Sequence, residues 1–576
     1  MRRLTLIGLA LVMPLLTVPL PAADALQAPR AASNSAAVAA APSATFAAAR
    51  EAAERIKAEK IREDLFFIAS DEMAGRDTPS PGLDRTAKFI ADRLAKLKLK
   101  PAGDKDSYFQ TIALRRTEMN REQTRAQLGA RSFNVVEDFL PTGTGTGAAE
   151  GQLVFAGHGW VFRPKNLNAY EGLDVRDKIV VVAGDGRTPP PGVTLQEVSD
   201  APSGSWETPL SYAQKHGAKG LVLVPQNYER RWRFGLRSAV RPVFYPERLL
   251  VADDEDEDDG AGGSASPPQQ LPAIIPSRAM LAALFEGESV DGARVLQAVT
   301  AGEPLSPFAL APAKRLRFDL SMKIERAETQ NIVAVVEGRD AKLKNEYVAV
   351  GAHYDHVGVG RAVGGDTIYN GADDDGSGTT ALLAMAEAFM KGPRPRRSII
   401  FVWHAGEEKG LWGSQYFAEF PTVPLKQIVT QLNIDMIGRS KRPGDTNPRN
   451  RMLTGPDEIY VIGSRMMSTE LANMSESVNR SYLNLKFNYH YDEPNDPERL
   501  FYRSDHYNYA KKGVPIIFYF DGVHEDYHQP SDTPDKIDYQ KMEKVTRSIF
   551  VLASELANAA RRPVVDKQVT ADRFSR

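Results

Sequence analysis

Short, strongly apolar runs alternate with segments of helical periodicity along the second half of this 576-residue chain. The apolar runs are NIVAVVE, YVAVGA, SIIFVW, IVTQLNI and VPIIFYF, and the helical segments include GTTALLAMAEAFMKG and DYQKMEKVTRSIFVLASELANAA. Near-continuous β-branched runs separated by helices are typical of a parallel sheet covered on both faces. The pattern predicts an α/β fold over residues 316–562, with a mixed, mainly parallel sheet sandwiched by helices and a tail at 563–576.

Two segments with different hydrophobic patterns precede this predicted sheet. Residues 46–140 open with apolar positions at three- and four-residue spacing, in AAAREAAERIKAEKIREDLFFIAS and LDRTAKFIADRLAKLKL, which predicts helices. Residues 141–315 carry the short β-rich runs GQLVFAGHGWVF, DKIVVVAGDG and AKGLVLVPQ, separated by turns, which predicts a separate β-rich domain. The acidic run at 253–259 lacks the alternating spacing of a calcium loop, so a solvated loop is favoured over a calcium site.

The N-terminus has the layout of a secretory signal peptide, because MRR is followed by LTLIGLALVMPLLTVPL and then by small residues. We predict a signal peptide over 1–25 and a flexible leader over 26–45, which is rich in Ala, Ser and Pro. An uncleaved anchor is the alternative, but Pro14, Pro19 and Pro21 disfavour a continuous spanning helix. We therefore expect an exported protein, periplasmic or secreted, without stable membrane insertion after cleavage.

Composition narrows the chemistry. The chain has no cysteine, which excludes disulfides, a thiolate zinc site and a cysteine nucleophile. Its formal net charge of −2 gives no indication of a nucleic-acid partner. Any bound metal must therefore be held by His, Asp and Glu.

Residues that commonly bind metals follow the predicted strands at their carboxyl ends. They are His353, Asp373, Glu407, Glu408, Asp435 and His528. In open α/β sheets ligands bind beyond the carboxyl ends of the strands, so we expect these side chains to meet in one cleft. Imidazole and carboxylate groups suit zinc, and two ions about 3.5–4 Å apart need a bridging carboxylate. The set predicts a hydrolase with two Zn²⁺.

The ligands can be divided between the two ions. Asp373 is predicted to bridge them because it lies in the tightest loop, YNGADDDGSG. The other ligands pair as His353 with Asp435 and Glu408 with His528. His356, His404, His490 and His524 are competing ligands that the sequence alone does not exclude.

Three neighbouring carboxylates receive other roles. Glu407 is left as the base that takes a proton from water and passes it to the leaving amine. Asp355, two residues after His353, is placed to accept the second ring N–H of that histidine. Asp374 is expected to shape its loop or to cap the following helix.

Five motifs in order resemble the di-zinc exopeptidases of peptidase clan MH, which include aminopeptidase Y, bacterial leucyl aminopeptidases and the glutamate carboxypeptidases. They are G-A-H-Y-D, N-G-A-D-D-D-G-S-G, H-A-G-E-E-K-G-L-x-G-S, L-N-I-D-M-I-G and Y-H-Q-P-S-D-T, and the resemblance covers about residues 330–560. Residues 46–140 resemble the N-terminal part of the same catalytic fold. The domain at 141–315 resembles the protease-associated (PA) domain that is often inserted between these two parts.

The resemblance implies the same ligand set and selects His528 over His524. It also implies a cis peptide bond between Asp373 and Asp374. Tyr527 resembles a tyrosine that hydrogen-bonds the tetrahedral intermediate, the alternative being that it packs in its loop. The segment R-S-D-H at 503–506 resembles a pocket-lining segment in which Asp505 and His506 contact substrate or orient ligands.

The expected function is an aminopeptidase that acts on peptide substrates. A carboxypeptidase or dipeptidase of the same fold is one alternative and would need a cation such as Arg503, Lys511 or Lys512 for the substrate carboxylate. A glutaminyl cyclase-like enzyme with a single zinc is disfavoured by His353. A non-catalytic binding ectodomain is disfavoured by the retained Glu407. The sequence indicates neither residue specificity nor oligomeric state.

Overall fold

The computed structural model describes residues 44–142, 146–186, 188–202, 204–239, 243–249 and 271–567. The predicted signal peptide, nearly all of the predicted leader and the acidic run at 253–259 lie outside these residues. Among the described residues, no helix combines the length and the apolar character needed to cross a membrane.

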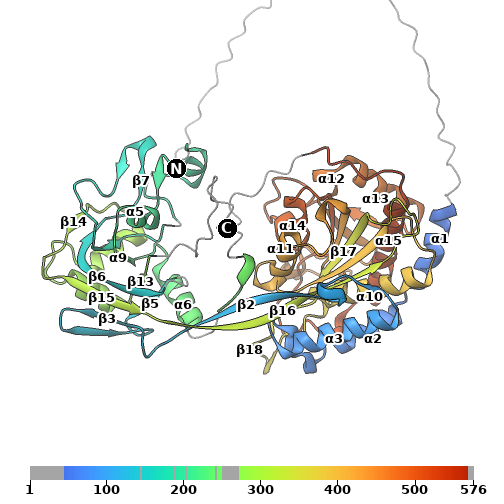
Figure 1. Ribbon diagram of the computed structural model, residues 1–576, viewed down its shortest axis with the longest axis horizontal. Coiled ribbons are helices and arrows are strands. Elements are labelled where there is room, and N and C mark those ends of the chain that lie inside the picture. The colour runs from blue at the N-terminus through green and yellow to red at the C-terminus, as the bar shows by residue number, and fades with distance from the viewer. Residues whose placement is uncertain are drawn as a thin grey trace, which may run out of the picture. The chain divides into compact units, whose positions relative to one another are not determined.

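A mixed sheet forms the centre of the part that contains the five motifs (Figure 1). Its order is β12-β2-β16-β20-β17-β21-β24-β22-β23, with the short β1 also paired to β16. The four adjacent strands β20, β17, β21 and β24 are mutually parallel, whereas β16 and β22 flank them in antiparallel pairing. The strands are β1 (Lys100–Pro101), β2 (Phe109–Met119), β12 (Val243–Pro246), β16 (Met322–Val336), β17 (Tyr347–His353), β20 (Ser398–His404), β21 (Ile428–Ile434), β22 (Glu458–Ile462), β23 (Lys486–Asn488) and β24 (Ile516–Phe520).

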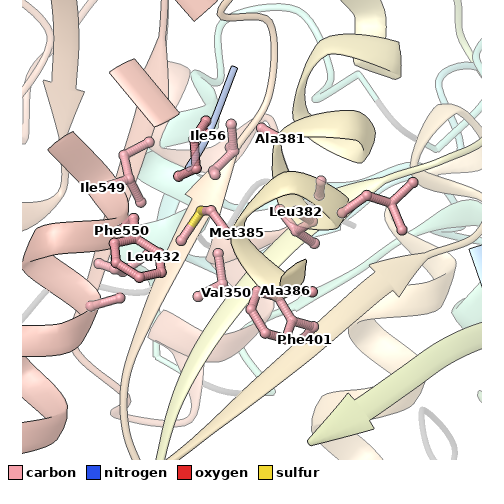
Figure 2. Packing of buried hydrophobic residues seen from close by; sticks show 14 of the residues in the cluster. Ile56, Val350, Ala381, Leu382, Met385, Ala386, Phe401, Leu432, Ile549 and Phe550 are labelled. Carbon is pink, nitrogen blue, oxygen red and sulfur yellow. The ribbon is translucent and has the colours of Figure 1, made fainter. Parts of the chain in front are cut away.

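Helices cover both faces of this sheet, which confirms the predicted fold class. The helices of this part are α1 (Ala44–Ala53), α2 (Ala58–Ile68), α3 (Pro81–Lys96), α10 (Gly378–Lys391), α11 (Trp412–Glu419), α12 (Ser464–Met467), α13 (Thr469–Ser481), α14 (His506–Lys511) and α15 (Tyr539–Asn558). Apolar residues of α10 and α15, such as Met385 and Phe550, pack against Val350, Phe401 and Leu432 of the parallel strands (Figure 2). These strands are buried on both faces, which explains why their sequences read as continuous apolar runs.

A second, nine-stranded sheet contains the β-rich runs of the first half of the chain. Its order is β4-β3-β15-β6-β9-β11-β13-β5, with β14 paired to β6. The strands are β3 (Arg125–Leu128), β4 (Arg131–Asn134), β5 (Phe139–Pro141), β6 (Gly147–Phe155), β9 (Ile179–Val182), β11 (Gly220–Leu223), β13 (Ala273–Pro276), β14 (Phe308–Ala309) and β15 (Arg315–Leu320). Around it lie α4 (Leu195–Asp200), α5 (Pro209–Lys215), α6 (Tyr228–Ala239), α8 (Arg278–Phe285), α9 (Gly292–Ala301) and a small sheet of β7 (Val161–Phe162), β8 (Leu167–Asn168) and β10 (Trp206–Glu207).

The predicted boundaries of the β-rich domain need correction. Strands β3, β4 and most of β5 precede residue 141, and β15 runs past residue 315, yet all of them pair within the second sheet. The chain leaves the central sheet along β2 and returns along β16, and these two strands pair from Phe109 with Ile332 to Met119 with Met322. The assignment of this region as a PA domain stays a prediction.

Candidate metal centre

The predicted ligands meet at one edge of the central sheet. His353 is the last residue of β17, Asp435 follows β21 directly, and Glu407 and Glu408 lie in a short turn after β20. His528 lies in the loop after β24. Because these four strands are adjacent and parallel, their carboxyl ends open on the same side.

Asp374 lies between two pairs of predicted ligands. Its Oδ1 is 3.2 Å from Nε2 of His353, and its Oδ2 is 3.1 Å from Nε2 of His528. His353 Nε2 is 3.6 Å from Oδ1 of Asp435. On the other side, His528 Nε2 is 3.1 Å from Oε2 of Glu408. The carboxylate that faces both pairs therefore belongs to Asp374.

Asp373 does not occupy the bridging position that we predicted for it. Its Oδ1 accepts a hydrogen bond from the backbone N–H of Gly438 at 2.7 Å, and its Oδ2 lies 3.2 Å from Nε2 of His524. The cis peptide bond is also one residue later than predicted, between Asp374 and Asp375. Consecutive carboxylates in this tight turn point in different directions. An assignment that is wrong by one residue therefore selects Asp373, which is bonded to the backbone, instead of Asp374, which faces the predicted ligands.

Asp375 is held by the backbone. Its Oδ2 accepts from the N–H of His353 at 3.2 Å, and its Oδ1 accepts from the N–H groups of Gly378 and Met436 at 2.8 and 3.2 Å. These bonds tie the loop to the ends of β17 and β21. Asp375 therefore fixes the backbone on which the ligands are mounted.

Glu407 lies beside the ligands without joining either pair. Its Oε2 is 4.0 Å from Nε2 of His353. Burial raises the pKa of Glu407 well above the ordinary value of a glutamate, and the neighbouring carboxylates of Glu408 and Asp435 add to the rise, against the opposing effect of His353. A carboxyl group whose affinity for a proton is increased in this way is suited to accept and return one.

Asp355 supports Glu407 rather than the His353 ring. Nδ1 of His353 lies 3.1 Å from the backbone oxygen of Asp355, but 3.7 Å from its carboxylate. The carboxylate instead accepts from the backbone N–H of Glu407 at 3.1 Å. The predicted carboxylate–imidazole bond is therefore replaced by a carbonyl–imidazole contact.

The segment R-S-D-H orients a ligand through a residue that we did not predict. Ser504 donates a hydrogen bond to Oδ2 of Asp435 at 2.6 Å and accepts one from Asn433 at 2.9 Å. Asp505 and His506 are both completely buried. Asp505 lies 3.2 Å from Nδ1 of His404, while Nε2 of His506 donates to the backbone oxygen of Phe501 at 2.8 Å. Ser504 was not predicted because serine is not a usual zinc ligand, so its residue type does not indicate a role at a metal site.

The competing histidines separate in space. His404 is paired with Asp505 and lies 2.9 Å from the hydroxyl of Tyr509, and His524 is held by Asp373. His490 is exposed and packs edge-to-face on Tyr491. Only His356 among these four lies with the ligands, since its Nδ1 is 2.9 Å from Oε1 of Glu408.

A pocket opens onto the ligands. Its polar wall contains His353, Asp374, Glu407 and Asp435, and its apolar wall contains Met436, Leu500, Phe518, Phe520 and Val523. Arg503 and Tyr527 complete the lining. Burial raises the pKa of Tyr527, so its phenol remains a hydrogen-bond donor throughout the neutral range. Asp505 and His506 are absent from this lining, so they lie behind the pocket rather than in it.

The donor set fits a pair of metal ions. Within the part of the chain that the structure describes, Oδ2 of Asp374, Oε1 of Glu408 and Nε2 of His528 are buried and make no hydrogen bond. Buried polar atoms of this kind normally have a partner. Imidazole nitrogens and carboxylate oxygens converge here as in zinc sites, and Asp374 offers one oxygen to each side.

The segment that matches a known family contains all of these ligands. Residues 331–553 match the model described as Peptidase family M28. This segment is similar to peptidase family M28. The match confirms the resemblance to clan MH exopeptidases, and it begins within β16 and ends within α15.

Several curated proteins are similar to the same region of this chain. A probable leucine aminopeptidase of Trichophyton verrucosum is 29% identical over 238 residues, which cover 40% of this chain and 58% of the relative. Another, from Arthroderma otae, is 30% identical over 247 residues, covering 41% of this chain and 60% of the relative. The chain thus spans less than two thirds of the length of these relatives.

Solved structures are similar over more of the chain. An aminopeptidase from Aneurinibacillus sp. strain AM-1 is 16% identical with a TM-score of 0.49, covering 91% of this chain and 98% of that one. BSAP, a zinc aminopeptidase from Bacillus subtilis, is 17% identical with a TM-score of 0.43, covering 89% of this chain and 98% of that one.

Arg76 holds together the segments that carry the ligands, and its loss is expected to loosen the centre. This fully buried side chain donates to the backbone oxygens of Ile68, Tyr354, Asn370 and Gly371 at 2.6–3.0 Å. Arg76→Lys cannot reach four carbonyls from one nitrogen, and each buried carbonyl that loses its partner costs roughly 1–3 kcal/mol. We expect a lower free energy of unfolding in urea for the metal-free protein, together with weaker zinc binding. Unchanged values of both would contradict this role.

His506 is expected to make stability depend on pH. Burial lowers the pKa of His506 to about 3, against an ordinary value of 6.5. Between pH 6.5 and 3, His506 is therefore protonated in the unfolded chain but neutral in the folded chain. The free energy of unfolding falls as the pH drops through this range, by about 1.4 kcal/mol per pH unit at most. Urea unfolding at several pH values should show a shallower fall for His506→Gln than for the unsubstituted protein. Parallel curves would mean that His506 does not contribute.

Proposed function

We propose that this chain is an exported di-zinc aminopeptidase that removes N-terminal residues from peptides. The observation that carries the proposal is the position of Asp374, whose two oxygens face His353 and His528 at 3.2 and 3.1 Å. His353 and Asp435 would hold one ion, and Glu408 and His528 the other. When bound, zinc would polarise the peptide carbonyl and make water a nucleophile at neutral pH.

The residues of the chain divide the remaining work. Glu407 takes a proton from the attacking water and returns it to the departing amine. The phenol of Tyr527, on the pocket wall, donates a hydrogen bond to the oxygen of the tetrahedral intermediate. The apolar wall formed by residues such as Met436, Phe518 and Phe520 accepts an apolar side chain of the substrate. Export is proposed from the signal-like N-terminus.

A carboxypeptidase or dipeptidase is the second candidate, and one observation favours it. Arg503 lines the pocket, where its guanidinium could bind a substrate carboxylate. The other two predicted cations are placed differently, because Lys512 pairs with Glu419 and Lys511 lies over the ring of Tyr507.

A panel of two substrate classes tests the proposal. Aminoacyl anilides have a free amine and no carboxylate, whereas N-blocked dipeptides have a carboxylate and no free amine. We expect cleavage of the anilides, fastest with apolar residues, and little cleavage of the blocked dipeptides. Cleavage of the blocked set alone, abolished by Arg503→Met, would establish the carboxypeptidase instead. Full activity with one zinc per chain would contradict the di-zinc mechanism.

A further inference from the structure

His356 is held rigidly beside the proposed second zinc site. It follows His353 by three residues and is completely buried. Its backbone N–H donates to the backbone oxygen of Arg76 at 3.1 Å. Its ring lies against Gly371, where an added Cβ would come within 2.4 Å of the ring Cγ and 2.6 Å of Cδ2. Glycine at position 371, with a φ of 60°, therefore leaves the space that the imidazole occupies.

The ring of His356 reaches the atoms that would hold the metal. Its Nδ1 is 2.9 Å from Oε1 of Glu408 and 3.7 Å from Oδ2 of Asp374. The ring packs edge-to-face on His528, with the ring centroids 5.5 Å apart. One ligand atom from each of His356, Asp374, Glu408 and His528 lies within 4.8 Å of the other three.

Hydrogen bonding does not account for this placement. Neither ring nitrogen of His356 makes a hydrogen bond to the residues that the structure describes. Nδ1 lies 2.9 Å from Oε1 of Glu408, and neither of these two atoms has a hydrogen-bond partner among the described residues. A buried imidazole without such bonds is costly, whereas coordination to a metal uses the in-plane lone pair of one nitrogen.

We propose that Nδ1 of His356 is an additional ligand of the zinc ion held by Asp374, Glu408 and His528. This inference rests on the proposed function for the identity of the metal. The two sites then differ, since this one has two imidazoles and two carboxylates, and the other has His353, Asp435 and the shared Asp374. Four protein ligands make a closed site, whereas three leave a position for substrate.

The asymmetry has a consequence for metal binding. Imidazole nitrogen favours zinc over the harder ions magnesium and manganese, which prefer oxygen. The site of His356 would therefore bind zinc more tightly and retain it during chelation. The site of His353 and Asp435 would exchange its ion more readily and take up the substrate carbonyl.

A crystal structure of the zinc-loaded, unsubstituted protein tests the assignment. We expect Nδ1 of His356 at about 2.0–2.1 Å from the zinc ion, the ordinary bond length to histidine. A zinc–Nδ1 separation beyond about 3 Å, with a hydrogen bond from the ring to Glu408, would overturn it by making His356 an orienting group only. No variant is needed for this comparison, so misfolding cannot obscure it.

Zinc titration against a chromophoric chelator gives a second readout without substrate. We expect His356→Ala to weaken the tighter of two binding steps by at least tenfold and to leave the weaker step unchanged. His490→Ala is the matched control, because His490 is exposed and outside the cluster. Equal binding curves for His356→Ala and the control would contradict the inference.

The two proposals fail separately in these experiments. If Nδ1 of His356 binds zinc but the zinc-loaded protein cleaves no peptide, the aminopeptidase proposal is contradicted and the ligand assignment stands. Peptide cleavage by a protein whose His356 lies away from zinc would do the reverse.

Discussion

Glu407→Gln is expected to lower kcat for aminoacyl anilides by about 10²–10⁴-fold, the range attributed to a general base, while zinc content stays unchanged. Glutamine keeps the size of the side chain and the backbone N–H that donates to Asp355, so the turn after β20 should persist. It cannot accept and return a proton. Steady-state kinetics and zinc analysis of the same preparation check both halves of the prediction.

Glu408→Gln is the matched control, because it changes the adjacent residue in the same way. Glu408 faces both His528 and His356, so its substitution should weaken zinc binding and lower activity through loss of metal. If Glu407→Gln lost zinc and Glu408→Gln kept it, the two roles would have to be exchanged.

Asp374→Asn is the second substitution with a large expected effect. The amide offers one oxygen where two are needed, so it can face His353 or His528 but not both. We expect loss of paired zinc binding and a fall in activity of at least 10³-fold. Zinc stoichiometry after dialysis against a weak chelator, together with kcat/KM, measures the outcome.

Asp373→Asn is the neighbouring control for this prediction. Its Oδ1 can still accept from Gly438, and the contact with His524 is the one that changes. We expect two zinc ions per chain and activity within about tenfold of the unsubstituted protein, since the contact that changes lies behind the site. Loss of zinc in Asp373→Asn with retention in Asp374→Asn would restore the assignment made from sequence.

Most of the proposed ligands could be located from sequence because they lie at strand ends. His353, Asp435 and the pair Glu407–Glu408 each follow a continuous apolar run, and parallel strands place such positions at one edge. The bridging residue could not be located in this way. Three consecutive aspartates share one turn, and the direction of each carboxylate depends on backbone angles such as those of Asp374 (φ −97°, ψ 100°) and Asp375 (φ −115°, ψ 48°). Residue type and spacing do not determine these angles.

Supporting residues were missed for a related reason. Arg76 lies between α2 and α3 but bonds to carbonyls near residues 354 and 370, and Ser504 orients Asp435 across a large sequence separation. Neither contact leaves a periodic or motif signal. The boundaries of the second sheet were misplaced because β3 and β15 have polar, partly exposed residues in alternation with buried ones. The sequences of such strands are less apolar than those of the buried strands, so they are harder to distinguish from loops.

Anomalous diffraction at the zinc edge, from crystals of the zinc-loaded protein, tests the central claim most directly. The account predicts two peaks about 3.5–4 Å apart, one near His353 and Asp435 and the other near Glu408 and His528, with the carboxylate of Asp374 between them. A single peak, or a pair of peaks bridged by Asp373, would contradict it.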